Sequence, residues 1–262
     1  MNHRFALVTG ATGGLGAAFA RALPETTDLL LTGRSEDRLA ALREELAFGD
    51  RRIETLACDL AQPAERARLI ARAEELEIDL LVNNAGLGSY GAVLDNDPAA
   101  EVETVEVNCA APVALTTALL PGMIERARLD GGRAAVINVS STFAVTPVPY
   151  LATYVATKAF LQSWTEALAE ELRRKPVDVL ALAPGAVRTP FASRAGFGPG
   201  RVPFAADPDD VAREGLQALG RCTVHVVGNA RRALLTPYYF PRRVAASGLA
   251  SLLGVVTRAT RR

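Results

Sequence analysis

The chain has 262 residues, of which 49% are hydrophobic and 22% are charged, as expected for a soluble α/β protein with a sizeable core. The 29 basic and 29 acidic residues give a formal net charge of zero, which excludes nucleic-acid binding driven by overall charge. Three widely spaced cysteines and no leader-like or membrane-spanning segment predict a cytoplasmic protein with reduced thiols and no metal site.

Short apolar runs alternate with helical patterns along the whole chain. The runs occupy residues 5–8, 28–32, 53–57, 78–82, 134–139, 177–183 and 223–227. Helical spacing of apolar residues covers 15–23, 36–48, 63–76, about 101–129 and 153–174, with a shorter helix after Pro208. Apolar strands separated by amphipathic helices predict a parallel sheet buried on both faces. We therefore expect an α/β fold in which residues 1–230 form a single-domain, Rossmann-type, doubly wound sheet of about seven strands.

A glycine-rich turn follows the first predicted strand. It reads TGATGGLG from Thr9 to Gly16, and a helical pattern comes directly after it. Glycines let the backbone approach a phosphate closely, and the start of the following helix favours negative charge. A strand before the turn and a helix after it predict a dinucleotide site, against the alternative of a purely structural turn. The predicted cofactor contacts in this turn are Gly10, Thr12, Gly13, Gly14, Leu15 and Gly16.

One pair of residues predicts acid–base chemistry. Only two of the 29 basic residues are lysines, and one of them, Lys158, comes four residues after Tyr154 within a helical pattern. Residues with this spacing share one helix face, so the ammonium can lower the pKa of the phenol towards neutral pH. The alternative is an interfacial tyrosine beside a surface charge.

Four more motifs follow in order along the chain. Asn83-Asn84-Ala85-Gly86 comes after the fourth strand, Asn108 lies in the next helix, Ser141 precedes Tyr154 by thirteen residues, and 184–189 reads PGAVRT. Together with the glycine-rich turn, these motifs resemble the short-chain dehydrogenase/reductase family over residues 5–191. The resemblance implies hydride transfer between a nicotinamide cofactor and a carbonyl or alcohol.

The resemblance also implies a role for each matching residue. Tyr154 is expected to be the acid/base, Ser141 to hydrogen-bond the substrate oxygen, Lys158 to bind the nicotinamide ribose, and Asn108 to hold a proton relay to solvent. Thr189 and the Val187 backbone are expected to hold the nicotinamide carboxamide. The further cofactor contacts that it implies are Asp59, Leu60, Asn84, Ala85, Gly86, Pro184 and Gly185. Asp59 has the alternative reading of a helix N-cap.

The end of the second strand bears on cofactor type. It reads Leu31-Thr32-Gly33-Arg34-Ser35, with Gly33 where members of the family that prefer NAD carry aspartate. Arg34 can pair with a 2′-phosphate and Ser35 can add a hydroxyl, which favours NADP over NAD. Glu36 and Asp37 would favour NAD instead, unless they are first-turn acids of the next helix.

The substrate side is predicted to be apolar, with a lid. Residues 188–207 mix glycines and aromatics in a pattern typical of a loop that closes over substrate. A lipophilic ketone, aldehyde or 3-oxoacyl group fits such a site, although the aromatics could instead pack the lid onto the body. The predicted pocket residues are Phe143, Val145, Tyr150, Phe191 and Phe197.

The C-terminal segment 231–262 has seven arginines and no acidic residue. We expect a helical extension there that lies on an anionic membrane, contacts an acyl substrate or packs on another subunit. The family resemblance implies a homodimer or homotetramer built on 101–129 and 153–174. Two alternative functions are a catalytically silent dinucleotide-binding regulator and a peripheral membrane-associated reductase.

Overall fold

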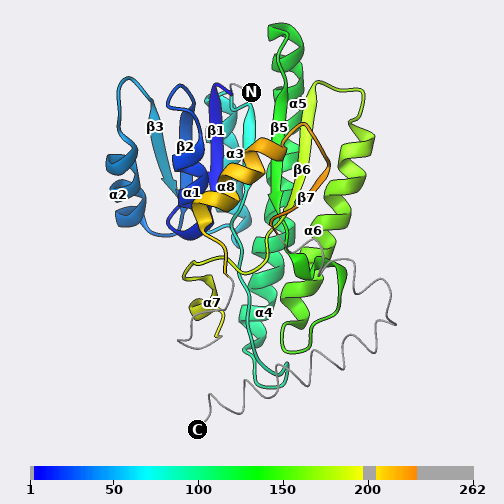
Figure 1. Cartoon of the computed structure of the whole chain (residues 1–262). Helices are drawn as coiled ribbons and strands as arrows, with labels where there is room; N and C mark the ends of the chain where they lie inside the picture. The colour runs from blue at the N-terminus through cyan, green and yellow to red at the C-terminus, as the bar shows by residue number, and fades with distance from the viewer. Residues whose placement is uncertain (1–2, 197–204, 229–262) are drawn as a thin grey trace.

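The computed structural model describes residues 3–196 and 205–228, which contain one seven-stranded parallel sheet (Figure 1). Phe197, part of the expected lid and the basic C-terminal extension lie outside the described residues. The strand order is β3-β2-β1-β4-β5-β6-β7, so the direction of winding reverses between β1 and β4. The strands are β1 (Phe5–Thr9), β2 (Asp28–Gly33), β3 (Ile53–Ala57), β4 (Leu80–Asn83), β5 (Ala134–Val139), β6 (Val177–Ala183) and β7 (Val224–Val226).

Helices cover both faces of this sheet. One apolar cluster joins the sheet to α1 (Gly14–Ala22), α2 (Glu36–Leu46) and α8 (Pro208–Ala218). The other joins it to α3 (Pro63–Glu75), α5 (Ala111–Asp130) and α6 (Ala152–Glu171). Side chains alternate between the two clusters along β1, with Ala6 and Val8 in the first and Phe5 and Leu7 in the second. Burial on both faces explains why the strands read as uninterrupted apolar runs.

The sequence-based elements match the structure, with two informative differences. The fourth strand begins at Leu80, two residues later than expected, and the Asp79 carboxylate before it accepts the backbone N–H groups of Arg4 and Phe5, at 2.9 and 3.1 Å. The expected helix at 101–129 consists of α4 (Pro98–Val105), a π-helical turn (Glu106–Ala110) and α5. Such π-turns are frequent at functional sites, and this one carries Asn108.

The continuous helix Pro98–Asp130 is unusually long and apolar. By length and composition alone it could cross a membrane, but 50% of its most apolar stretch is buried inside the fold. Its α5 part packs in the same apolar cluster as α3 and the sheet. The buried half of this stretch therefore belongs to the core of the fold.

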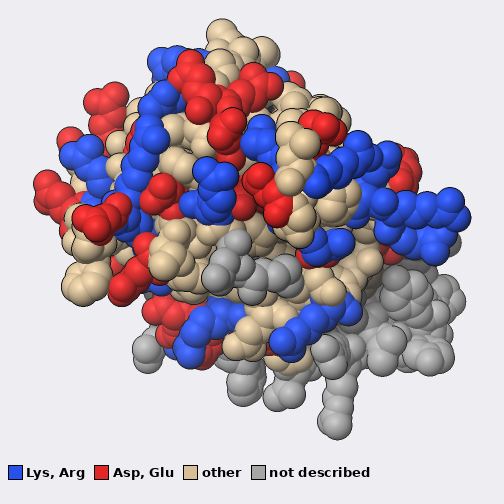
Figure 2. Space-filling view, turned by 90° about the horizontal axis from the view of Figure 1, so that it is seen from above, with Lys and Arg blue, Asp and Glu red and all other residues tan. Residues whose placement is uncertain are grey.

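Charges of both signs are interspersed at the amino ends of the strands. Figure 2 views the molecule from this side, and acidic and basic groups alternate over it. The pairs there include Arg133 with Asp178, at 2.8 Å, and Arg4 with Asp130, at 3.8 Å. The charge of this face is therefore largely compensated within the face itself.

Candidate active site

A cleft of about 650 Å³ opens where the carboxyl ends of the strands meet. Ligand sites in doubly wound sheets lie at this edge, where the winding direction reverses. Residues from the glycine turn, from the ends of β2, β4, β5 and β6, and from α6 line it together. The predicted residues that it brings together are Gly10, Thr12, Gly13, Gly14, Leu15, Arg34, Asp59, Leu60, Asn84, Ala85, Gly86, Ser141, Phe143, Tyr154, Lys158, Pro184, Gly185, Val187, Thr189 and Phe191.

Tyr154, Ser141 and Lys158 meet at one end of this cleft. Tyr154 and Lys158 both lie in the first turns of α6. Ser141 is the second residue after the end of β5, next to Ser140. Ser141 hydrogen-bonds to Tyr154, and its Oγ also accepts the backbone N–H of Phe143 at 3.2 Å. The Lys158 Nζ lies 5.8 Å from the centroid of the Tyr154 ring. A phenol and a hydroxyl that both face the cleft can bind one substrate oxygen.

Lys158 is a buried cation, with only 4% of its surface exposed. Its Nζ donates a hydrogen bond to the carbonyl oxygen of Val139 at 2.8 Å, which fixes the ammonium beside the end of β5. The Ser140 hydroxyl donates to the Lys158 carbonyl oxygen at 3.1 Å and ties α6 to the same strand end. Burial lowers the pKa of Lys158 to about 8, because desolvation penalises its charged form.

The expected lowering of the Tyr154 pKa is wrong for the protein's own groups. Burial raises the pKa of this phenol above its usual value, and the hydrogen bond to Ser141 opposes the rise. Lys158 does not lower it, because burial brings the pKa of Lys158 to about 8 and its amine is therefore neutral before the phenol ionises. Tyr154 therefore stays protonated at neutral pH, as a proton donor must.

Asn108 is fully buried in the π-helical turn and does not line the cleft. Its Oδ1 accepts the N–H of Leu87 at 2.8 Å, while its Nδ2 donates to the Leu87 carbonyl at 2.9 Å and to the Thr157 hydroxyl at 2.9 Å. These three bonds join the segment after β4 to α6, one residue before Lys158. Asn108 is therefore a positioning residue in this structure.

The glycine turn is held against the end of β4. The Thr9 hydroxyl accepts the N–H groups of Asn84 and Ala85, both at 3.0 Å, and the Asn84 amide donates to the Thr9 carbonyl at 2.9 Å. Gly14 adopts a left-handed φ of 57°. A Cβ at Gly16 would lie 2.2 Å from the Gly10 carbonyl oxygen, which explains why Gly16 is required although it does not line the cleft.

The last residue of β2, Gly33, is packed against Thr12. A Cβ at Gly33 would lie 2.6 Å from the methyl carbon of Thr12, so an aspartate there would have to displace Thr12. Arg34 lines the cleft and pairs with Glu103 of α4 at 3.0 Å. Glu36 and Asp37 are first-turn acids of α2, as expected, and neither lines the cleft.

Ser35 has a different contact from the expected one. Its hydroxyl accepts the backbone N–H of Arg38 at 3.4 Å and caps α2, and the residue is outside the cleft lining. Asp59 does line the cleft, and the alternative reading as a helix N-cap is wrong because α3 begins after Gln62. The Asp59 carboxylate instead accepts the N–H of Ala61 at 3.1 Å, which shapes the turn after β3.

Two of the predicted substrate-pocket residues line the cleft. Phe143 is 38% exposed at its mouth, and the ring of Phe191, from α7 (Phe191–Arg194), lies 5.4 Å from that of Tyr154. Val145 and Tyr150, also predicted for the pocket, lie outside this lining. Tyr150 has a left-handed φ of 67° that directs its ring onto Tyr90, with centroids 6.2 Å apart.

Sequence reasoning missed several residues that the cleft contains. Arg38 could have been found by its nearness to Arg34, since it lies four residues further along, in the first turn of α2. Arg194 carried no comparable signal, since it is 160 residues from Arg34 along the chain. The other missed lining residues include Leu87, Val107, Thr142, Leu151 and Pro190.

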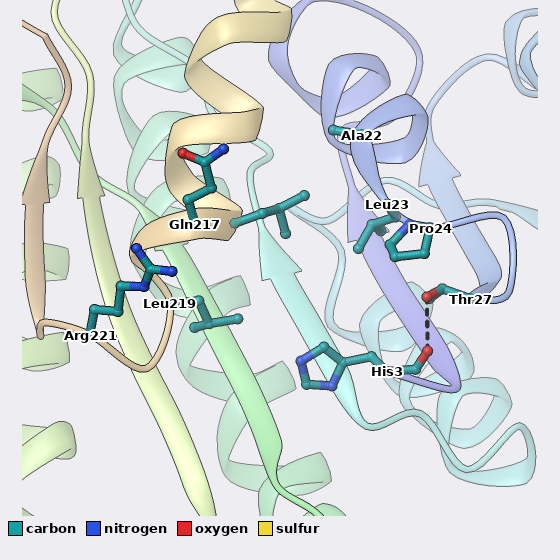
Figure 3. A pocket seen from close by; sticks show the side chains of 9 residues that line it. His3, Ala22, Leu23, Pro24, Thr27, Gln217, Leu219 and Arg221 are labelled. Carbon is teal, nitrogen blue, oxygen red and sulfur yellow. Dashed lines mark hydrogen bonds between the residues drawn. The ribbon is translucent and has the colours of Figure 1, made fainter. Parts of the chain in front are cut away.

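A second cavity, of about 300 Å³, lies near the amino end of β1, away from these motifs (Figure 3). The Thr27 hydroxyl donates to the His3 carbonyl oxygen at 2.8 Å across one side of it. Its lining is mostly apolar and contains none of the motif residues. Among the described residues, no cluster of three or more His, Cys, Asp or Glu side chains could hold a metal ion.

A family model for short chain dehydrogenases matches residues 4–196, which include every motif described above. Among curated proteins, dehydrogenase/reductase SDR family member 7B of Bos taurus is 32% identical over 240 residues, covering 84% of this chain and 72% of that protein.

Two solved structures share the fold at similar identity. A short-chain dehydrogenase from Sphingobium yanoikuyae in complex with NADPH has a TM-score of 0.79 and 29% identity, covering 95% of each chain. The 3-ketoacyl-(acyl-carrier-protein) reductase from Brucella melitensis complexed with NADH has a TM-score of 0.74 and 28% identity, covering 86% of this chain and 96% of that one. Similar structures therefore occur with both kinds of nicotinamide cofactor.

Proposed function

This chain belongs to the short-chain dehydrogenase/reductase family, and we propose that it is an NADP-dependent reductase of lipophilic carbonyl compounds. Membership makes it an oxidoreductase that acts on CH–OH and C=O groups. One observation carries the finer proposal. The cleft holds Tyr154, Ser141 and Lys158 at one end, and at its other end β2 is followed by arginines and has no aspartate as its last residue.

The residues of the cleft fit a dinucleotide. A Cβ at Gly14 would lie 2.9 Å from the Thr189 side chain, and one at Gly10 would lie 2.9 Å from the Ala85 backbone, so glycines let the turn pack closely on the segments that line the cleft beside it. The start of α1 would hold the pyrophosphate, and Arg34 would hold a 2′-phosphate. When bound, the reduced cofactor supplies the hydride.

Tyr154 would donate its hydroxyl proton to the carbonyl oxygen of the substrate as negative charge develops there. Its raised pKa keeps this proton in place at neutral pH. The Ser141 hydroxyl, already bonded to Tyr154, would donate a second hydrogen bond to the same oxygen. The two donors together fix the position of the carbonyl group.

Lys158 would hold the nicotinamide ribose through its ammonium group. Its attachment to Val139 keeps the ammonium in one place, so little reorganisation accompanies the reaction. Asn108 would keep the segment after β4 at the correct distance from α6, through its bonds to Leu87 and Thr157.

The substrate class follows from the apolar side chains around Tyr154. Phe143 and Phe191 flank the position where the carbonyl would lie, and Leu151 adds a third apolar side chain. We propose a lipophilic ketone, an aldehyde or a 3-oxoacyl group. The similarity to a 3-ketoacyl reductase supports the last of these.

Exposed apolar side chains support assembly into a homo-oligomer. On the described surface, Val102 and Val105 of α4 and Phe160 of α6 are 63%, 44% and 44% exposed. Large apolar groups on neighbouring helices are typical of a subunit interface. We propose a cytoplasmic dimer or tetramer built on these helices, measurable by light scattering.

The test is NADPH oxidation with a panel of ketones, aldehydes and 3-oxoacyl thioesters. The wild-type protein should turn over at least one class, and Tyr154→Phe should reduce turnover by about 10³ while still binding NADPH. Retained turnover in that variant would contradict the acid/base assignment. No turnover of any compound, with intact NADPH binding, would favour a silent regulatory protein.

A further inference from the structure

The short helix α7 contacts both ends of the cleft. Phe191 at its start lies against Tyr154, with ring centroids 5.4 Å apart. Arg194 at its end lines the same cleft as Arg34 and Arg38. Figure 1 shows α7 beyond the carboxyl ends of β1 and β2, in the half of the sheet that carries the glycine turn. One element therefore borders the catalytic tyrosine and the arginines of the cofactor end.

The three arginines gather positive charge that the described residues do not balance. Arg34 pairs with Glu103 at 3.0 Å, whereas Arg38 and Arg194 form no ion pair with any described residue. The three arginines line one cleft, and, after burial, the charges of Arg34 and Arg38 lower the pKa of Arg194, as like charges near one another do. Repulsion of this kind is relieved when an anion binds among the charges.

The position of the cluster indicates which anion it would bind. The pyrophosphate of a dinucleotide belongs at the start of α1, near Gly14 and Thr189. Arg34 and Arg38 instead flank the end of β2, where the adenosine ribose is recognised. A 2′-phosphate is a compact dianion with three acceptor oxygens, which suits several guanidinium groups.

We propose that Arg194 is a specificity-determining residue that binds the 2′-phosphate of NADP together with Arg34 and Arg38. This inference rests on the proposed function, because it takes NADP as the cofactor. The new element is that α7, which borders the substrate pocket through Phe191, also recognises the cofactor. Binding of the 2′-phosphate would then hold Phe191 against Tyr154, whereas NAD would leave the end of α7 without an anionic partner.

The test measures binding directly, by calorimetry with NADP⁺, NAD⁺ and 2′,5′-ADP. Arg194→Gln should raise the dissociation constants of NADP⁺ and 2′,5′-ADP about tenfold, and leave that of NAD⁺ unchanged within about twofold. Arg194→Lys should retain most of the affinity, because it keeps the charge. Arg188→Gln is the matched control, since Arg188 lies three residues before α7, pairs with Asp207 at 2.7 Å and should not alter the NADP⁺/NAD⁺ ratio.

Two results would overturn the inference. Equal weakening of NADP⁺ and NAD⁺ in Arg194→Gln would place this guanidinium on the pyrophosphate, and no change would remove it from the cofactor site. Failure of the proposed function has a separate signature. In that case the wild-type protein itself would bind NAD⁺ more tightly than NADP⁺, whatever the variants do.

Discussion

The two ends of the cleft both use positive charge, but in opposite surroundings. At the catalytic end, Lys158 is buried and bonded to the Val139 carbonyl oxygen, and burial lowers its pKa to about 8. At the cofactor end, the side chain of Arg34 is 57% exposed beside Arg38 and Arg194. The buried cation has one fixed position, whereas the exposed ones keep their charge and can adjust to a phosphate.

The difference matches the two tasks. A cation next to a proton donor must be held in place, and burial is the physical means, although it destabilises the charged form. Cations that select a phosphate need charge and planar donor groups more than rigidity, and water screens them. This explains why lysine, with its compact ammonium, is used at the catalytic end of a chain that otherwise relies on arginine.

The contrast between the buried and the exposed cations would be contradicted most directly if arginine could replace Lys158. Lys158→Arg keeps the charge, but the guanidinium does not fit the space that directs Nζ at Val139. We expect kcat/KM to fall by about 10³ in the carbonyl-reduction assay. The matched control is Lys175→Arg, which should retain activity. Lys175 is the only other lysine in the chain, and it is exposed. Comparable activity in both variants would show that charge alone suffices at position 158.

A second test measures how strongly burial of Lys158 destabilises the fold. The pKa of Lys158 is about 8 in the folded protein, against an ordinary value of 10.5 that applies to the unfolded chain. Below pH 8 the lysine is therefore charged in both the folded and the unfolded protein, and the full cost of burying the charge destabilises the fold. Between pH 8 and 10.5 only the unfolded state keeps the proton, so stability should rise with pH. Across this range the free energy of unfolding of the wild type should gain about 3 kcal/mol relative to Lys158→Met.

Urea unfolding of both proteins at several pH values gives this difference. The constant effects of the substitution, such as the lost bond to Val139, cancel in the pH dependence. Parallel curves for the two proteins would mean that the ammonium is not desolvated. The contrast between the two ends of the cleft would then rest on geometry alone.

The smallest expected effect concerns the exposed end. Arg34→Gln should weaken NADP⁺ binding about tenfold at low salt, and the difference from wild type should shrink at high salt, because exposed charges are screened. Glu103→Gln is a control with the opposite sign, since it removes the carboxylate 3.0 Å from Arg34 and should strengthen NADP⁺ binding. An effect of Arg34→Gln that does not depend on salt would mean that this arginine acts in a dry site, like Lys158.

Most of the architecture could be predicted from the sequence. The strands at Ile53–Ala57, Ala134–Val139 and Val177–Ala183 have the predicted boundaries. In the last two, burial on both faces leaves a nearly continuous apolar run that ends where pairing ends. The π-helical turn was not predictable, since an extra residue in a helical turn does not alter the apolar pattern enough to be recognised. The Tyr154 pKa was predicted in the wrong direction, because a four-residue spacing does not show how deeply the phenol and the lysine are buried.

The sequence by itself determined the family, the dinucleotide turn and the positions of Ser141, Tyr154 and Lys158. Each of these is set by local backbone chemistry or by spacing within one or two adjacent elements, so it can be read along the chain. Only the tertiary structure decided that Asn108 clamps Leu87 to α6, that Tyr150 turns away from the cleft, and that Arg194 joins Arg34. Those contacts depend on how loops from distant strands come together at one edge of the sheet, and no local sequence pattern predicts them.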